Sequence, residues 1–353
     1  MQPIAPQPNH PMSTPSYVMS SRRVKGQGAA AVFEPEPGTM RFLRVPAGKV
    51  HHPSHEIDAA DWFEEVRDRA DGMADSRVSD GGDVVIFIHG YNNTPAVVSQ
   101  RQRFLNEDLA AEGFHGLVIS FDWPADDATL NYLEDRSDAA EVAQLLVTHG
   151  ITILARGQTK LGCQTNVHLL GHSTGAYIIF EALAQAEKIG SLFKQDWRVD
   201  QVALIGADVS SGTLASDAAW SRPLFDRCVR VTNYQNPFDH VLAVSNAKRL
   251  GASPRAGRVG APKTNAHAKV VNVNCGDYFK TINPKKARFS GTFAHSWHIG
   301  DRVWARDFAL SLTSGIDRNA LPTRARGGDG GLVLQDAPAP KFFAGWTMER
   351  NDP

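Results

Sequence analysis

Short apolar runs alternate with longer amphipathic stretches through most of this chain. Residues 84–88 (VVIFI) are all apolar and end at His89 and Gly90, which is typical of a strand buried on both faces of a sheet. Similar runs predict further strands at residues 117–121, 167–170, 202–207, 229–233 and 270–273, with the run at 270–273 as the last strand.

Helical spacing fills the intervals between these strands. Apolar positions three and four apart predict helices over residues 96–111, 131–156 and 176–183. Strands joined by helices of this length run parallel, and the helices then cover both faces of the sheet. The pattern therefore predicts an α/β fold with a mostly parallel central sheet, in which functional residues gather at the carboxyl ends of the strands.

Composition and charge narrow the possible partners. The chain has 353 residues, with 37 Lys and Arg against 38 Asp and Glu, so it offers no electrostatic footprint for nucleic acid or an anionic membrane surface. No apolar run is long enough for a transmembrane segment. Three widely spaced cysteines, Cys163, Cys228 and Cys275, and the absence of a secretory signal pattern predict a reducing, cytoplasmic location.

Residues 171–175 (GHSTG) hold the strongest chemical signal. They lie between the predicted strand at 167–170 and the predicted helix at 176–183, which is the context of a G-x-S-x-G nucleophile turn. Such a turn is so tight that Gly171 and Gly175 are needed on either side, and it leaves the hydroxyl of Ser173 exposed above the sheet. Ser173 is therefore the candidate nucleophile.

A serine nucleophile needs a base and an acid that orients the base, and in this fold they follow in the order Ser, acid, His. Asp239 comes just after the predicted strand at 229–233 and is the candidate acid, while Asp208, after the strand at 202–207, is the rival. His295 is the favoured base. His298, nearer the closing helix, is the alternative.

Two backbone amides are expected to bind the oxyanion. One is that of Thr174, directly after the nucleophile, and the other comes from the loop at 89–93 after an early strand. Tyr91 is the expected donor in that loop, with Asn92 as the alternative.

Several of these motifs together resemble a known family, the α/β hydrolases of uncharacterised function called DUF900. The resemblance covers residues 80–315 and implies an esterase-like or lipase-like serine hydrolase, with His295 as base and Asp239 as acid. His298 stands where the family has an aromatic residue, and the basic stretch 246–269 looks like an insertion. The motifs are HGYNN (89–93), FDWP (121–124), YLEDR (132–136), GHSTG (171–175), the strand end at Asp208 and HSW (295–297). Within them Trp123 and Asp135 are expected to be scaffold.

The resulting hypothesis is hydrolysis of a carboxylic ester, small or lipid-like, through an acyl-enzyme and without metal or cofactor. Amidase or thioesterase chemistry on the same residues, and a non-catalytic binding or scaffold protein of the same fold, are the alternatives. A metal-dependent hydrolase at residues 51–56 (HHPSHE) is disfavoured, because Pro53 prevents the helical pairing of histidines used in zinc proteases.

The chain is expected to fold around one large domain with appendages. Residues 1–30 are predicted to be disordered, and residues 31–78 to form leading strands and a helix on the core. The α/β-hydrolase domain is expected over 79–318, with a basic, Gly- and Pro-rich surface loop at 246–269. Residues 319–353 are expected to form a C-terminal tail.

Overall fold

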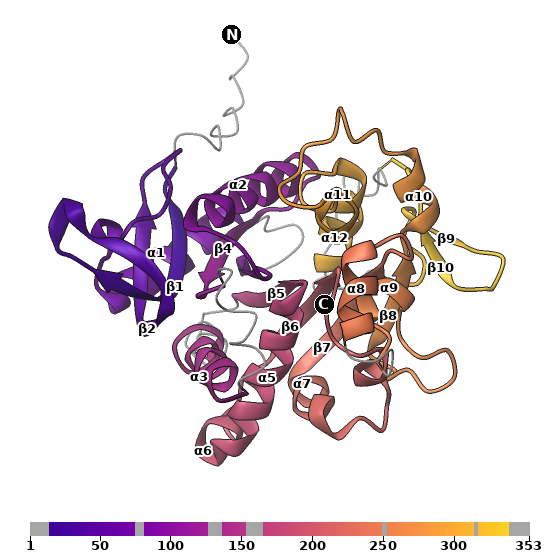
Figure 1. Cartoon of the computed structure of the whole chain (residues 1–353), viewed down its shortest axis with the longest axis horizontal. Helices are drawn as coiled ribbons and strands as arrows, with labels where there is room; N and C mark the ends of the chain where they lie inside the picture. Colours follow the sequence, from indigo (N-terminus) through magenta and orange to yellow (C-terminus); the bar gives the residue numbers. More distant parts are fainter. Residues whose placement is uncertain are drawn as a thin grey trace, which may run out of the picture.

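A computed structural model describes residues 14–74, 81–125, 136–152, 165–248, 253–313 and 317–338. In these residues one ten-stranded sheet has the order β2-β1-β4-β3-β5-β6-β7-β8-β10-β9 (Figure 1). Only the edge strands β2 and β9 are antiparallel to their neighbours. The strands are β1 Ser16–Lys25, β2 Val32–Val45, β3 Asp83–Ile88, β4 Gly116–Asp122, β5 Asn166–His172, β6 Val199–Ile205, β7 Cys228–Gln235, β8 Val270–Asn274, β9 Arg324–Arg326 and β10 Leu332–Leu334.

Helices cover both faces of this sheet (Figure 1). On one face lie α1, α3, α5 and α7, and on the other lie α2 and α12. The described α-helices are α1 Ala59–Met73, α2 Pro95–Ala111, α3 Arg136–Leu146, α5 Thr174–Lys188, α6 Gly190–Phe193, α7 Arg222–Arg227, α8 His240–Lys248, α9 Ala256–Val259, α10 Gly276–Thr281, α11 Phe293–Ser296 and α12 Arg302–Leu312. A π-helical turn, Val147–Ile151, continues α3.

Alternation along β3 shows why residues 84–88 are all apolar. Ile86 and Ile88 belong to the core cluster under α1, α3 and α5, while Val85 and Phe87 belong to the cluster under α2 and α12. Successive side chains of a strand point to opposite faces, so both faces must be apolar where helices cover both. The predicted fold class, an α/β fold with a mostly parallel sheet, is confirmed.

The sheet extends further than the sequence pattern indicates. β8 is not the last strand, because β10 pairs with it in parallel and β9 pairs with β10. Both lie in the segment that we expected to be a C-terminal tail. Each strand has only three residues, which is too short for a recognisable alternation, although Leu332 and Leu334 are buried.

At the other end, β1 lies within the first 30 residues, which we expected to be disordered. Its residues Tyr17, Val18 and Met19 are buried, and the strand is paired with both β2 and β4. The apolar residues 17–19 are compatible with a leading strand, but composition carries no record of the long-range partners that order the rest of β1.

Part of the basic segment 246–269 is packed rather than solvated. Ala256 and Gly257 are buried, and the Gly257 N–H donates to the carbonyl of Ala207 at 3.0 Å. A Cβ atom on Gly257 would lie 2.1 Å from the Ala207 nitrogen, so glycine is required for this approach. Residues 249–252 lie outside the described residues.

Candidate active site

Ser173 occupies the turn between β5 and α5 with a backbone conformation that non-glycine residues rarely adopt. Its φ is 55° and its ψ is −120°. The neighbouring strand end holds it there, because the Ser173 N–H donates to the carbonyl of Ile205 at 3.0 Å and its carbonyl accepts from Asp208 N–H at 3.1 Å. A strained conformation that is held by its surroundings is common at functional sites.

The glycines on either side of this turn are required by close packing. A Cβ on Gly175 would lie 2.1 Å from the carbonyl oxygen of Ile88, and a Cβ on Gly171 would lie 2.9 Å from the Cα of Ala176. The G-x-S-x-G pattern therefore reflects the passage of the turn directly against β3 and the first turn of α5.

Asp239 and His295 meet at this end of the sheet. The Nδ1 atom of His295 lies 2.6 Å from Oδ2 of Asp239, whose side chain is fully buried, while Oδ1 of Asp239 accepts from the Leu242 N–H at 3.1 Å. The carboxylate thus binds the first turn of α8 with one oxygen and the imidazole with the other. With Nδ1 engaged, Nε2 is the ring atom of His295 left to exchange a proton.

Two residues that sequence reasoning missed set the position of His295. Asn236 donates through Nδ2 to the carbonyl of Ala294 at 2.9 Å, which links the loop carrying Asp239 to α11. Gly206, with φ 52°, lies so close that a Cβ there would be 3.1 Å from Nδ1 and Cε1 of the imidazole. Their sequence neighbourhoods gave no signal of this role, because both act through contacts between distant loops.

The rival acid has other partners. Asp208 forms an ion pair with Arg255 at 3.2 Å and accepts a hydrogen bond from the Ser245 hydroxyl at 2.8 Å. These contacts attach α8 and the segment before α9 to the end of β6. Of the two aspartates considered from the sequence, Asp239 is the one hydrogen-bonded to His295.

The rival base is packed as a core residue. His298 is fully buried and stacks on Trp297 with ring centroids 4.1 Å apart. Burial lowers its pKa well below the usual range, so the ring is neutral. Among the described residues neither of its ring nitrogens has a hydrogen-bond partner. His240, next to Asp239 in the sequence, is exposed at the start of α8.

The loop at 89–93 runs directly beside Ser173. A Cβ on Gly90 would lie 2.7 Å from the Cβ of Ser173, so only glycine fits there. Asn92 has φ 53°, and its N–H donates to the carbonyl of Ala125, which engages this amide away from the serine. Thr174 is the first residue of α5, where backbone N–H groups have no intrahelical acceptor.

A buried arginine and histidine connect α2 to the same end of the sheet. Arg101 Nη1 lies 3.3 Å from His172 Nδ1, and His172 Nε2 lies 3.2 Å from the carbonyl oxygen of His295. Because a guanidinium can only donate, Nδ1 accepts and the imidazole proton is on Nε2. Burial lowers the pKa of Arg101 to about 10, and burial together with the Arg101 charge holds the pKa of His172 well below its usual range.

The other sequence candidates do not gather into a metal site. His51 contacts Asp122, and His52 caps the short helical turn Pro53–His55. Across the described ranges there is no cluster of three or more His, Cys, Asp or Glu suited to a metal ion. Trp123 is buried against His89, whereas Asp135 lies outside the described residues.

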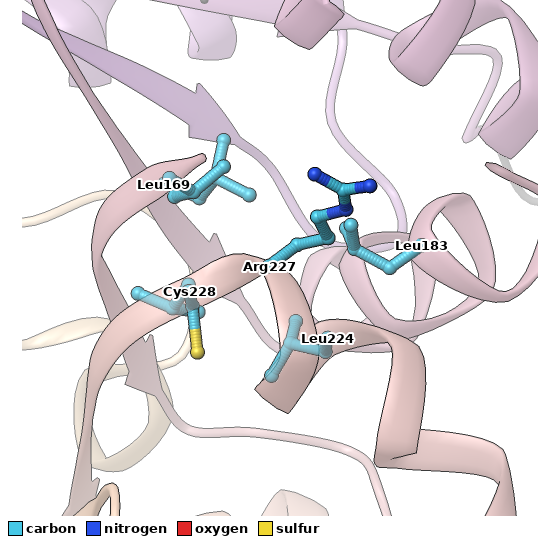
Figure 2. A pocket seen from close by; sticks show the side chains of 7 residues that line it. Leu169, Leu183, Leu224, Arg227 and Cys228 are labelled. Carbon is cyan, nitrogen blue, oxygen red and sulfur yellow. The ribbon is translucent and has the colours of Figure 1, made fainter. Parts of the chain in front are cut away.

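A narrow crevice lies away from these residues, between β5, β6, α5 and α7 (Figure 2). It has no room for a water molecule and contains none of the candidate site residues, so it is a packing gap of the core. Its lining consists of Leu169, Leu183, Val199, Val202, Leu224, Arg227 and Cys228.

Within the described residues, no helix is both long and apolar enough to span a bilayer.

In proteins built on this kind of sheet, a serine held at a strained strand-to-helix turn marks the α/β hydrolase class. The chain belongs to the family of α/β hydrolases of unknown function, DUF900, whose family model matches residues 69–295. Its general class is therefore that of a hydrolase. No curated protein sequence matches the chain.

Several solved structures share a distant likeness. A lipase-esterase related protein from Clostridium acetobutylicum ATCC 824 is 14% identical, with TM-score 0.20, over 38% of this chain and 46% of that chain. A "Putative hydrolase" from Agrobacterium vitis S4 is 14% identical, with TM-score 0.30, over 75% and 92%. Phospholipase PlaB from Legionella pneumophila, in complex with thio-NAD, is 14% identical, with TM-score 0.27, over 64% and 44%. The chain thus spans less than half of the Clostridium and Legionella chains, and likenesses this low carry no argument about activity.

Proposed function

We propose that this protein is a serine hydrolase that cleaves carboxylic esters with Ser173, His295 and Asp239. The observation that carries the proposal is the hydrogen bond from His295 Nδ1 to Asp239 Oδ2, at 2.6 Å, on an imidazole that packs against His172, the residue before a serine held at positive φ. A base oriented by a buried carboxylate is what a serine hydroxyl needs in order to act as a nucleophile near neutral pH.

In the proposed reaction the Ser173 hydroxyl attacks the ester carbonyl while Nε2 of His295 takes its proton. The backbone amides of Tyr91 and Thr174 bind the negative charge that develops on the carbonyl oxygen. His295 then gives the proton to the departing alcohol, which leaves an acyl group on Ser173. Water, deprotonated by His295, hydrolyses this acyl-enzyme and restores the serine.

An ester is the proposed substrate because an alkoxide leaves more readily than an amide nitrogen, and the same residues would serve thioesters. We propose further that the substrate is a small or lipid-like ester, that the protein acts in the cytoplasm and that it needs no cofactor. No contact in the described residues favours amide hydrolysis or a purely structural role over ester hydrolysis.

Labelling with a fluorophosphonate tests the nucleophile without knowledge of the substrate. The native protein should form one adduct, mapped by peptide analysis to Ser173, and neither denatured protein nor Ser173→Ala should react. His295→Gln should lower the labelling rate by a factor of about 10³ or more, since triad residues act as a unit.

His298→Phe provides the matched control. Phenylalanine retains the aromatic packing against Trp297 in a slightly larger ring and removes both ring nitrogens, so folded His298→Phe should label at the wild-type rate. Loss of labelling in this variant, with labelling retained in His295→Gln, would show that the wrong histidine has been assigned. Absence of any adduct on folded wild-type protein would contradict the proposed function itself.

A further inference from the structure

A buried charged cluster lies beneath the loop at 89–93. Arg22 of β1 is 1% exposed and Asp122 at the end of β4 is 0% exposed, and Arg22 Nε lies 2.9 and 3.0 Å from the two carboxylate oxygens. The Ser20 hydroxyl at 3.0 Å and His51 Nε2 at 2.9 Å also contact Asp122 Oδ2. We call Ser20, Arg22, His51 and Asp122 the β1–β4 cluster.

The cluster is ionised and fully buried. Burial by itself raises the pKa of Asp122, but the charge of Arg22 and the hydrogen bond from His51 hold that pKa well below the usual range. The carboxylate of Asp122 can only accept, so His51 Nε2 carries a proton and donates it to Oδ2, while His51 Nδ1 lies 2.8 Å from the Ser99 hydroxyl. Replacing such a pair by apolar side chains often costs little stability, so its presence calls for another explanation.

The cluster holds the loop at 89–93 through Asn93. Arg22 Nη2 donates to the backbone carbonyl of Asn93 at 2.6 Å. The Asn93 side chain in turn donates to the carbonyls of Gly90 at 2.7 Å and Tyr91 at 2.8 Å. Arg22 therefore fixes the backbone of Asn93, whose side-chain amide binds the carbonyls of Gly90 and Tyr91.

His89 also binds the Gly90 carbonyl. Its Nδ1 lies 2.8 Å from the Gly90 carbonyl oxygen, which can only accept, so Nδ1 carries a proton and donates it. Its Nε2 lies 3.1 Å from the backbone nitrogen of Trp123 and 3.2 Å from Oδ1 of Asp122, which connects His89 directly to the cluster. Burial lowers the pKa of His89, which keeps the ring neutral. Trp123 stacks on His89 with planes 9° apart and donates through Nε1 to the His89 carbonyl at 2.8 Å.

These contacts determine where the Tyr91 amide points. A trans peptide group is planar, with its C=O and the following N–H in opposite directions. Because His89 and Asn93 bind the Gly90 carbonyl from one side, the N–H of Tyr91 is directed to the other side of the same peptide plane. No cis peptide bond occurs in the described residues.

We infer that Arg22 and Asp122 are positioning residues for the oxyanion-binding amide of Tyr91. This inference rests on the proposed function, in which that amide binds the oxyanion. Arg22 comes from the leading strand β1, outside residues 69–295 that the family model matches, so a strand before the matched residues helps to shape the site.

The test uses two arginine-to-lysine variants at buried ion pairs. Arg22→Lys keeps a cation opposite Asp122 but lacks the second nitrogen that reaches the Asn93 carbonyl. Arg324→Lys makes the same change in the pair Arg324–Asp307, whose side chains are also 0% exposed but which joins β9 to α12. Both variants are compared with wild type in the full chain, for hydrolysis of p-nitrophenyl butyrate and for amide hydrogen exchange.

Arg22→Lys should lower kcat by about 10- to 100-fold with KM within a factor of about three, since one oxyanion donor contributes about 10²–10³ in kcat. Exchange of the amides at 90–93 should accelerate at least about tenfold. Arg324→Lys should leave kcat of the folded protein unchanged and affect exchange at 90–93 no more than elsewhere.

Equal exchange at 90–93 in the two variants, or an unchanged kcat in Arg22→Lys, would overturn the inference. The double variant Arg22→Met/Asp122→Leu, which leaves no unpaired charge, serves if Arg22→Lys does not fold, and the same outcomes are expected of it. Wild-type protein without turnover or labelling at Ser173 would instead contradict the proposed function, and the exchange measurement would still decide whether the cluster holds the loop.

Discussion

Single atoms decide how the residues of the site can act. One carboxylate oxygen of Asp239 accepts from the first turn of α8 and the other contacts His295. The same side chain therefore caps the helix and orients the imidazole. Gly206 leaves just enough room for the same ring, because a Cβ there would lie 3.1 Å from Nδ1. The position of the imidazole thus depends on a residue without a side chain.

Gly206→Ala should therefore impair the site more than its cost in stability suggests. Its positive φ of 52° predicts a loss of about 1–2 kcal/mol in the free energy of unfolding. The added methyl group should also displace the imidazole and lower kcat by about tenfold or more, as small misplacements of catalytic groups do.

Gly48→Ala is the matched control for this change. Gly48 has φ 72° and open space around its Cβ position, so alanine there carries the backbone penalty without any contact to His295. Urea unfolding and ester hydrolysis are measured for both variants. Equal kcat values for the two folded proteins would mean that Gly206 does not constrain the base.

At the scale of elements, the candidate site lies at the carboxyl ends of the four neighbouring strands β3, β5, β6 and β7. The loop after β3 passes Ser173 after β5, the end of β6 holds the Ser173 backbone, and the loop after β7 carries Asp239. Buried neutral histidines occur at two of these connections, namely His89 and His172, and a third, His298, lies between α11 and α12. Burial is the largest cause that lowers the pKa of each one.

These histidines predict that stability falls as the pH is lowered below neutrality. In the unfolded chain each would titrate near pH 6.5, whereas its pKa in the folded protein is lower. The unfolded chain then binds more protons below about pH 6.5, so stability is fully present above that pH and is lost as the pH falls toward the folded pKa values.

The slope should approach about 1.4 kcal/mol per pH unit for each such histidine. The free energy of unfolding in urea is measured at several pH values between 7.5 and 5. His298→Phe removes one of the groups and should give a shallower dependence. An identical slope in wild type and His298→Phe would show that His298 is not neutral and buried as described.

At the scale of the whole molecule, the C-terminal strands β10 and β9 complete one edge of the sheet. A buried ion pair between β9 and α12 joins this edge to the rest of the protein. Arg324 of β9 donates to Asp307 of α12 at 2.6 Å, and Asp307 also accepts from the Tyr234 hydroxyl at 2.7 Å and the Thr323 hydroxyl at 2.6 Å. The segment after α12 is therefore connected through polar contacts to the middle of the protein.

Arg324→Met should lower the free energy of unfolding by about 3–5 kcal/mol, because it leaves the carboxylate of Asp307 buried without its cation. Arg324→Met/Asp307→Leu should recover much of this loss, since neither charge then remains. Both are measured by urea unfolding. A loss below about 1 kcal/mol in Arg324→Met, as for an exposed ion pair, would contradict a structural role for this connection.

The sequence by itself determined the class of fold and the order of the candidate chemistry. Short, mainly apolar runs alternating with helical spacing identify a parallel sheet covered on both faces, and the predicted strand positions agree with β3 to β8. The pattern at 171–175 identifies the strained serine, because only glycines fit beside it. These features are local, so they are visible along the chain.

Only the tertiary structure shows that Asp239 contacts His295, whereas Asp208, which has similar sequence surroundings, pairs with Arg255. It also brought β1, β9 and β10 into the sheet and Arg22 beneath the loop at 89–93. Each of these depends on contacts between residues far apart in the chain. Local pattern cannot encode such pairings, because their free energy arises only when the segments meet in the folded protein.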